Sequence, residues 1–308
     1  MESLTTEKEE TREINQEEMQ YINLIKNIIN TGHTEVGRNG KTVSLFGASM
    51  RFSLKNGRIP ILTTKKLAWK TCLKELLWFI SGKTSNNILK EQGVHIWDGN
   101  ASREFLESRG LGHYADGELG PIYGHQWRHY NAKWIGDADY RNDDCCEKGI
   151  DQLQEIINQL KNPETRTSRR IIMTTWNPCQ LSKMALPPCH IMCQFNVHGG
   201  NQLSCSLYQR SGDVGLGISF NIASYSFLTH LLAKHCGLEA CEFVYFLGNV
   251  HIYDDHIDAM KEQILRKPFD FPKVEIKQLR ENINDYQFED FEVFNYNSHS
   301  QIKMIMRK

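Results

Sequence analysis

The chain has 308 residues, of which 40% are hydrophobic and 24% are charged, and its formal net charge is −1. These values are typical of a globular protein with a sizeable core, and they provide no overall field that would attract nucleic acid or a membrane surface. There is no apolar run of about 18 residues, as a transmembrane helix requires, and the acidic N-terminus lacks the apolar stretch of a signal peptide. Nine scattered cysteines favour a reducing compartment, so we expect a cytoplasmic protein, with the nucleus as an alternative.

The first half of the chain alternates between strong patterns and polar loops. Residues 1–15 are highly charged and predict a flexible segment, whereas 16–308 predict one α+β domain. Apolar residues at positions 19, 22, 25 and 29 predict a helix that stops at Gly32, and residues 42–54 alternate as strands do. Residues 67–82 predict a helix, and 98–120 and 129–149 predict loops with a short helix.

The second half predicts strands joined mostly by hairpins. An amphipathic helix at 150–160 ends before Pro163, and strands at 170–176, 192–197 and 202–211 follow, the last two flanking a hairpin turn at 198–201. A long apolar helix at 220–237, a strand at 243–248 and a helix at 255–266 complete the order. The glycines in 210–221 do not have dinucleotide-binding spacing, and we expect no βαβ unit there. Close approach of the backbone to a flat ligand better explains Gly212, Gly215 and Gly217.

Cys189, in the sequence Pro-Pro-Cys-His, is the first candidate for chemistry. A structural zinc site normally has four ligands, and Cys189, His190 and Cys193 have no second ligand cluster to complete one. Two prolines fix the backbone just before the thiol, which suits presentation into a cleft. A thiol with a pKa of about 8.5 is mostly protonated at neutral pH, so a nucleophile here needs a neighbouring cation. Packing and nucleophilic roles both remain open on this local evidence.

Arginines at the edges of predicted strands are candidates for that cation and for binding phosphate. Arg38 lies in a glycine-bracketed loop, Arg169 and Arg170 precede a strand, and Arg210 ends one. Each is either an exposed surface charge or part of a guanidinium fork around phosphate. Arg210 can serve both the phosphate and a nearby thiolate.

Three further polar positions interrupt apolar patterns. Glu75 lies in a helix that is apolar nearly all round, so it is either a desolvated acid–base group or a side chain that reaches solvent. Asn221 begins an apolar helix, as an N-cap or as an amide that reads a base edge. His251 and Tyr253 alternate and can face one cleft, or they are ordinary polar residues at a strand end; the spacing from His251 to His256 does not fit a helical zinc site.

Together these segments resemble the thymidylate synthase / dCMP hydroxymethylase family, in its eukaryotic and viral form. The resemblance covers about residues 19–306 and is carried by a series of motifs in one order rather than by a single motif. The matching segments are ELLWFISG (75–82), IWDGN (96–100), LGPIYGHQWRH (119–129), SRRIIM (168–173), MALPPCH (184–190), LSCSLYQRSGDVGLG (203–217), FNIASY (220–225), HIYDDH (251–256) and FPKV (271–274).

The resemblance implies an α+β fold with a mixed β-sheet flanked by helices, whose sheets pack across an obligate homodimer. Residues 16–308 would form a single catalytic domain of this family. The implied reaction is reductive methylation of dUMP to dTMP, in which 5,10-methylenetetrahydrofolate gives both the one-carbon unit and the hydride, without a metal. Nucleic acid is not an expected partner for this activity.

The resemblance also implies roles for individual residues. Cys189 would add to C6 of the pyrimidine, Glu75 would relay protons through water, and Tyr123 is linked to removal of the C5 proton. Asn221 would read the uracil edge. The other residues matching the nucleotide site are Arg38, Gln209, Arg210, Ser211, Asp213, His251 and Tyr253, with Arg169 and Arg170 supplied by the other subunit. Those matching the folate site are Trp97, Asp213, Leu216, Gly217 and Phe220, and His190 and Gln209 would complete a water network.

Two departures and two rival functions accompany the resemblance. The loop GRNGKTVSLFG is one residue shorter than the family's phosphate loop, and the sequence ends in Arg307-Lys308 where relatives tend to have small or apolar residues. A hydroxymethylase is the nearest rival, although cytosine-specific relatives carry aspartate at the position of Asn221. An idle paralogue that binds nucleotide or RNA is the second, and the intact Cys189 and Glu75 argue against it.

Overall fold

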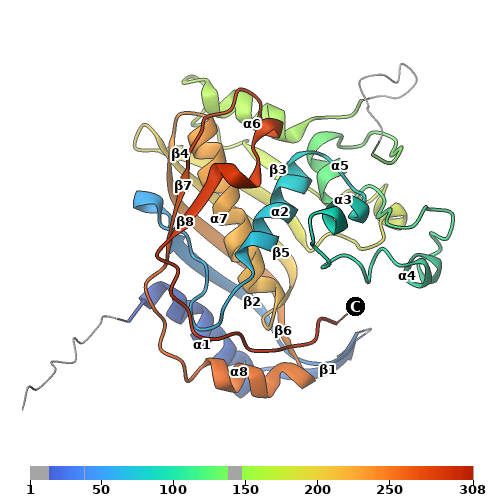
Figure 1. Ribbon diagram of the computed structural model, residues 1–308, viewed down its shortest axis with the longest axis vertical. Coiled ribbons are helices and arrows are strands. Elements are labelled where there is room, and N and C mark those ends of the chain that lie inside the picture. The colour runs from blue at the N-terminus through green and yellow to red at the C-terminus, as the bar shows by residue number, and fades with distance from the viewer. Residues whose placement is uncertain (1–13, 38, 138–147, 308) are drawn as a thin grey trace, which may run out of the picture.

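The computed structural model describes residues 14–37, 39–137 and 148–307, and a six-stranded sheet is its centre (Figure 1). Neighbouring strands are antiparallel except β5 and β6, which are parallel, so the sheet is mixed as expected. The strands lie in the order β1 (His33–Gly37), β2 (Gly40–Ser53), β6 (Glu239–Tyr253), β5 (Gln202–Asp213), β4 (His190–His198) and β3 (Ile172–Thr174).

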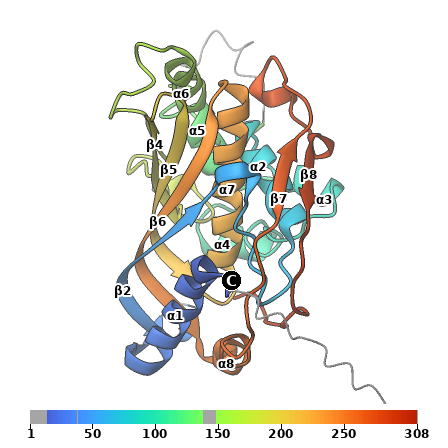
Figure 2. The same ribbon diagram turned by 90° about the vertical axis from the view of Figure 1, so that its left-hand side faces the viewer.

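Helix α7 (Gly217–His235) connects β5 to the parallel strand β6, so this region does form a βαβ unit. The expectation that no such unit surrounds residues 210–221 is therefore wrong: a missing nucleotide fingerprint does not prevent a long apolar helix from returning the chain. α7 is buried nearly all round because the sheet covers one side and α2 (Trp69–Ile80) packs on the other. Figure 2 shows these layers with the sheet nearly edge-on.

The remaining elements surround this core. α1 (Gln16–Thr31) is capped by Asn15, whose Oδ1 accepts hydrogen bonds from two backbone amides of the first turn, and it ends at Gly32 as predicted. The predicted helix at 150–160 is confirmed as α6 (Gln152–Lys161). The other elements are α3 (Asn86–Glu91), α4 (Arg103–Ser108), α5 (Tyr123–Arg128), α8 (Ile257–Gln263) and a small hairpin of β7 (Lys273–Ile276) and β8 (Phe291–Phe294).

The two faces of the sheet differ in their cover. On β5, Leu203, Cys205 and Leu207 are fully buried toward α7, as the alternation predicts, whereas Tyr208 points to the opposite face and is exposed. Tyr208 pairs in register with Phe246 of β6, which is also exposed. This second face also exposes Phe46, at 84% of its surface, and Ile172.

Parts of three sequence expectations concern residues outside the described ranges. Residues 1–13 of the predicted flexible segment lie outside them, as does part of the 129–149 loop. Arg38 and Lys308 also lie outside the described residues. Within the ranges that are described, no helix is long and apolar enough to span a membrane.

Candidate active site

Cys189 lies immediately after Pro187-Pro188 and one residue before β4, in a backbone position fixed from two sides. Its N–H donates to the hydroxyl oxygen of Tyr123 at 2.7 Å, and its carbonyl accepts from the Arg210 N–H at 2.9 Å. The side chain is partly exposed, unlike that of Cys193, which is buried in the sheet. The structure therefore presents Cys189 at a surface and assigns Cys193 to the core.

The side chain of Arg210 is locked beside this cysteine. Its Nε donates to the Pro188 carbonyl at 2.8 Å and its Nη2 to the Pro187 carbonyl at 2.9 Å. Nη2 also lies 3.8 Å from Cys189 Sγ, and the guanidinium is 5.6 Å from the ring centre of Trp176. Arg210 thus supplies the neighbouring cation that the thiol was expected to need. The two prolines before Cys189 also hold the Arg210 side chain in place.

The ionisation of Cys189 differs from the expectation that a nearby cation would correct its pKa. Burial raises the pKa of the thiol, and the positive charge of Arg210 opposes this shift without reversing it. Desolvation is the larger of the two effects, although the guanidinium lies only 3.8 Å from the sulfur. The thiol is therefore protonated at neutral pH in this form of the protein.

Glu75 is the buried carboxylate that the helical pattern indicated. It is only 6% exposed on α2, and its Oε1 accepts a hydrogen bond from Trp97 Nε1 at 2.7 Å. Burial raises the pKa of Glu75 to about 7, although the Trp97 bond acts in the opposite direction. The alternative of a glutamate reaching solvent is wrong, and the group can both release and take up a proton near neutral pH.

Tyr123 connects this carboxylate to the cysteine. Its ring meets that of Trp97 edge-on at 6.2 Å between centroids, and its hydroxyl oxygen receives the Cys189 N–H. Burial raises the pKa of Tyr123 far above its usual range, so the hydroxyl keeps its proton. Glu75, Trp97, Tyr123 and Cys189 therefore form one continuous path, which we call the floor of the site.

His190 and Asn221 meet from two different elements. α7 begins at Gly217, so Asn221 lies in its second turn and the N-cap alternative is wrong. Burial lowers the pKa of His190 to about 4, while a hydrogen bond with the Asn221 side chain opposes the shift. The imidazole is therefore neutral, and its buried Nδ1 has no hydrogen-bond partner among the described residues. It cannot be the cation that activates Cys189.

The amide of Gln209 is fixed by a partner that the sequence did not indicate. Gln209 is buried opposite His190 on the neighbouring strand, and its Nε2 donates to the Ser211 carbonyl at 2.8 Å. Tyr245 on β6 donates its hydroxyl proton to Gln209 Oε1. Tyr245 alternates with apolar core residues, so its sequence position indicated packing only.

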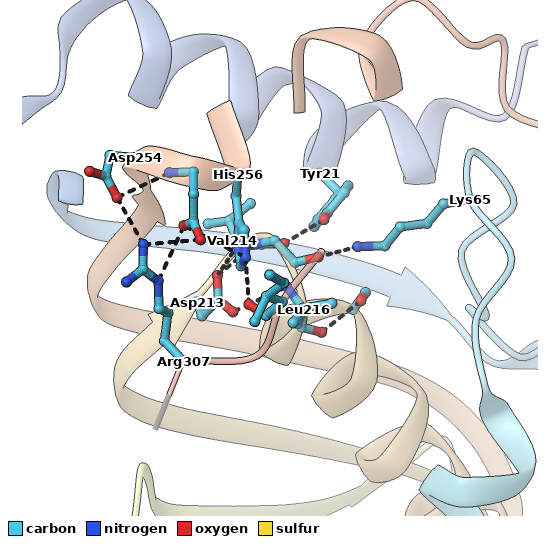
Figure 3. Close-up of polar contacts among 12 residues, drawn as sticks. Tyr21, Lys65, Asp213, Val214, Leu216, Asp254, His256 and Arg307 are labelled. Atoms are coloured by element: carbon cyan, nitrogen blue, oxygen red, sulfur yellow. Dashed lines mark hydrogen bonds and ion pairs between the residues drawn. The ribbon is translucent and has the colours of Figure 1, made fainter. Parts of the chain in front are cut away.

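A second polar group surrounds the loop between β5 and α7, and we call it the rim (Figure 3). The Asp213 carboxylate accepts the N–H groups of Gly215 at 2.8 Å and Leu216 at 3.3 Å. Tyr21 donates to the Val214 carbonyl at 2.6 Å. The buried Lys65 donates to the Gly215 carbonyl, and burial lowers its pKa to about 8. No local pattern indicates Tyr21 and Lys65, because they lie 193 and 150 positions from their partners Val214 and Gly215 in the sequence.

Gly212, near the end of β5, and Gly215, in the loop, each have a packing reason in addition to the predicted approach of a ligand. A Cβ on Gly212 would lie 2.9 Å from the Ile218 side chain, and one on Gly215 would lie 2.7 Å from His256 Nδ1. A Cβ on Gly217 would meet nothing closer than 3.8 Å, so only Gly217 keeps open space. Leu216 and Phe220, on either side of it, are partly exposed.

His251 and Tyr253 point to the same side of β6, as their alternation predicts, with ring centroids 5.2 Å apart. His251 pairs in register with Asp213, and its Nδ1 lies 2.9 Å from Asn249 Oδ1. These two side chains therefore join the rim to the end of β5 that carries Arg210 and Ser211.

Arg169 and Arg170 are not brought to this site within the chain. Both are exposed in the loop before β3, and the next residue, Ile171, accepts a hydrogen bond from the N–H of Phe195 at 2.9 Å. Phe195 is six residues along the strand direction from Cys189, a separation of about 20 Å. The loop that carries both arginines therefore starts about 20 Å along the sheet from Cys189 of the same chain.

The fold and the site define a class: an α+β protein in which a cysteine beside an arginine is connected through a buried tyrosine to a buried carboxylate. A family model described as Thymidylate synthase matches residues 19–308. The chain belongs to the thymidylate synthase family.

The known proteins that resemble the chain include long bifunctional proteins and shorter ones of about the length of the chain. It is 49% identical over 296 residues to the bifunctional dihydrofolate reductase-thymidylate synthase of Leishmania major, a match that covers 95% of the chain and 55% of that protein. It is 50% identical over 304 residues to the thymidylate synthase of Saccharomyces cerevisiae, covering 95% and 97%. The thymidylate synthase of Equine herpesvirus 2 is 48% identical over 292 residues, covering 94% and 98%. The chain thus spans about half of its bifunctional relatives and nearly all of the shorter ones.

Proposed function

We propose that the protein converts dUMP to dTMP by reductive methylation, with 5,10-methylenetetrahydrofolate as co-substrate and dihydrofolate as the second product, and that residues 16–308 form one catalytic domain. The observation that supports this most is the Cys189 thiol held 3.8 Å from Arg210 Nη2 on the same floor as the buried Glu75. Relatives named thymidylate synthase match almost the whole chain.

Cys189 is the nucleophile in this proposal. Its Sγ adds to C6 of the pyrimidine while its proton passes to water, and the addition makes C5 a carbon nucleophile. Arg210 is the cation that stabilises the thiolate, because His190 is neutral with a pKa of about 4.

Glu75 and Tyr123 move protons around the ring. A carboxyl with a pKa of about 7 is present in both forms at neutral pH, so Glu75 can give a proton toward the pyrimidine O4 and recover it through water. Tyr123 keeps its own proton, and its oxygen is anchored by the Cys189 N–H, so it assists removal of the C5 proton by orienting the water that accepts this proton rather than as the base itself. Asn221 offers a donor and an acceptor to the uracil edge, and His190 holds its amide.

The residues around Gly217 fit a flat co-substrate. 5,10-Methylenetetrahydrofolate supplies the one-carbon unit and the hydride. Gly217 leaves open space beside the partly exposed Leu216 and Phe220, and Asp213 fixes the loop that carries them through two backbone hydrogen bonds. Trp97, which follows α3 in the chain and donates to Glu75 on α2, borders the same ligand.

The phosphate of dUMP is held by Arg210 and Ser211, with Arg38 from the loop between β1 and β2, and its deoxyribose hydroxyl by His251 and Tyr253. Gln209 orders water at the ring. Arg169 and Arg170 bind the phosphate of the dUMP molecule that is held in the site of a second copy of the chain. Two observations support this homodimer: these arginines are about 20 Å from their own Cys189, and the face of the sheet away from α7 exposes several large apolar side chains. They are Phe46, Ile172, Tyr208 and Phe246.

The free cysteines support a proposal for the compartment of the protein. The seven cysteines within the described ranges are free, which supports a reducing environment such as the cytoplasm or the nucleus.

The test is an assay of dUMP with 5,10-methylenetetrahydrofolate in which both products are identified. Equal amounts of dTMP and dihydrofolate are expected. Hydroxymethyl-dUMP together with tetrahydrofolate would instead assign a hydroxymethylase. Asn221 in place of aspartate argues against dCMP as substrate, so dCMP should give no product.

Donation of arginines across the dimer is tested by mixing two inactive variants. Cys189→Ala and Arg170→Ala subunits are refolded together in equal amounts. Half of the dimers are then mixed and carry one intact site of two, so about a quarter of the wild-type activity returns. No recovery in mixed dimers of confirmed composition would contradict the donation.

A further inference from the structure

The last described residues of the chain lie across the rim and are held there by charge. His256 is buried, and its Nε2 lies 2.8 Å from the Ile305 carbonyl. A Cβ on Gly215 would lie 3.3 Å from Met304 Sδ, so the segment packs directly on the loop between β5 and α7. We call residues 302–307 the strap.

Arg307 fastens the strap to the turn after β6 (Figure 3). Its Nη2 lies 3.3 Å from Asp254 Oδ1 and 3.0 Å from Asp255 Oδ2, and its Nε donates to Asp255 Oδ1 at 3.3 Å. The guanidinium also lies over the Tyr253 ring, 5.9 Å from its centre. One cation therefore engages two carboxylates and an aromatic face, and we call this group the clasp.

The clasp is connected to both parts of the proposed site. Tyr253, under the guanidinium, stands beside His251 on β6, where the nucleotide sugar is proposed to bind. His256 lies 3.9 Å from Asp255 Oδ1 and 4.0 Å from Asp213 Oδ1, and Asp213 holds the loop proposed to carry the folate. Movement of the strap thus reaches the folate loop through His256 and Met304.

The electrostatics agree with a persistent but reversible clasp. Partial burial raises the pKa of Asp255, but the hydrogen bond from Arg307 and the charges of His256 and Arg307 outweigh it and lower that pKa. The side chains of Arg307, Asp254 and Asp255 keep 34%, 46% and 37% of their surface exposed. Salt screens such exposed charges, so the clasp weakens as ionic strength rises.

We infer that Arg307 is a positioning residue: by clasping Asp254 and Asp255 it holds the strap over the Asp213–Gly217 loop and keeps that loop ready for the folate co-substrate. This inference rests on the proposed function only where it concerns binding of the folate co-substrate. The docking of the strap itself is a property of the protein without ligands.

If the strap exchanges between docked and undocked forms, the apparent affinity for folate scales with the docked fraction. Arg307→Ala is expected to raise the KM for 5,10-methylenetetrahydrofolate about two- to fivefold, the range of an exposed ion pair, with little change in the KM for dUMP. Arg307→Glu places three negative charges together and raises it about tenfold. Arg307→Lys restores part of the loss. Lys303→Ala removes an exposed charge from the same strap outside the clasp and is the matched control.

The experiment combines hydrogen exchange of the strap, without ligands, with folate kinetics at low and high salt. We expect faster exchange in Arg307→Ala and Arg307→Glu, no change in Lys303→Ala, and convergence of wild type and Arg307→Ala in high salt. Restoration of slow exchange by combining Arg307→Glu with Asp254→Lys and Asp255→Lys supports the clasp. Unchanged exchange in Arg307→Glu, or equal increases in the KM for both substrates, overturns it. Altered exchange in a protein that does not turn over dUMP refutes the proposed function and leaves the clasp standing.

Discussion

The floor of the site and the clasp are stabilised in opposite ways. On the floor, Glu75 and Tyr123 are buried, and burial raises the pKa of each, which favours the uncharged form. In the clasp, Arg307, Asp254 and Asp255 remain charged and partly exposed. Desolvation therefore controls the floor, whereas paired charges in a screened environment control the clasp.

This difference predicts what each region responds to. Floor variants should be sensitive to pH and to the loss of single atoms, because a buried group has no water to replace a lost partner. Clasp variants should be sensitive to salt, because their charges interact partly through solvent. The predictions below test this contrast, from the largest expected effect to the smallest.

Removal of the nucleophile should have the largest effect. Cys189→Ala is expected to lower kcat by about four orders of magnitude or more, because no other described thiol lies beside Arg210. dUMP binding, measured by calorimetry, should remain detectable, since Arg210 and Asn221 are unchanged. Normal turnover by this variant would contradict the role of Cys189.

Glu75→Gln should act through chemistry rather than binding. The amide oxygen can still accept the Trp97 N–H, but the side chain no longer carries a proton, so kcat should fall about 10²- to 10³-fold with little change in the KM for dUMP. Any feature of the wild-type kcat–pH profile near pH 7 should disappear. A variant that keeps this feature would show that another group titrates there.

The same substitution should increase stability at high pH. The pKa of Glu75 rises from 4.5 to about 7 on folding, so between these values the folded state binds more protons than the unfolded state. Wild-type stability therefore falls as pH rises through this window. Above pH 7, Glu75→Gln should have a free energy of unfolding higher by on the order of 1–3 kcal/mol, and the gain should shrink toward pH 4.5. Urea unfolding at pH 5 and pH 8 measures this; an equal difference at both values would refute it.

Tyr245→Phe tests a smaller contribution, from the polar groups beside the floor. The change leaves the buried Gln209 Oε1 without its donor, which should lower the free energy of unfolding by about 1–2 kcal/mol. Urea unfolding measures this, and an unchanged free energy of unfolding would mean that the Gln209 bond contributes nothing.

The clasp should give the smallest effect and the only one removed by salt. Arg307→Ala is expected to change folate KM by about two- to fivefold at low ionic strength. A salt-dependent defect in Glu75→Gln, or a salt-independent one in Arg307→Ala, would break the contrast between the two regions.

The features that were predictable from sequence are local or periodic. α1 and α6 follow from apolar spacing and their stop signals, and the burial of Glu75 follows from apolar residues on both sides of it in α2. The hairpin of β4 and β5 follows from its glycine turn. These patterns depend only on residues that are close to one another in the sequence.

The features that were missed depend on distant partners. Lys65 meets Gly215, and Arg307 meets Asp254, across 150 and 53 positions, and no local pattern pairs them. The start of α7 at Gly217 lies three residues before the predicted start at residue 220, because Leu216 has no capping side chain that would mark the beginning of the helix. The raised pKa of Cys189 depends on packing around the thiol, which the Pro-Pro-Cys-His sequence does not specify.

The most direct test of the central claim is mass spectrometry of the protein after incubation with 5-fluoro-dUMP and 5,10-methylenetetrahydrofolate. Fluorine at C5 cannot leave as a proton does, so a covalent complex should accumulate after attack at C6 and methylene transfer. We predict a mass increase equal to nucleotide plus folate, located on the peptide that contains Cys189 and absent in Cys189→Ala. An adduct on a different cysteine, or no adduct in a protein that binds both ligands, would contradict the account.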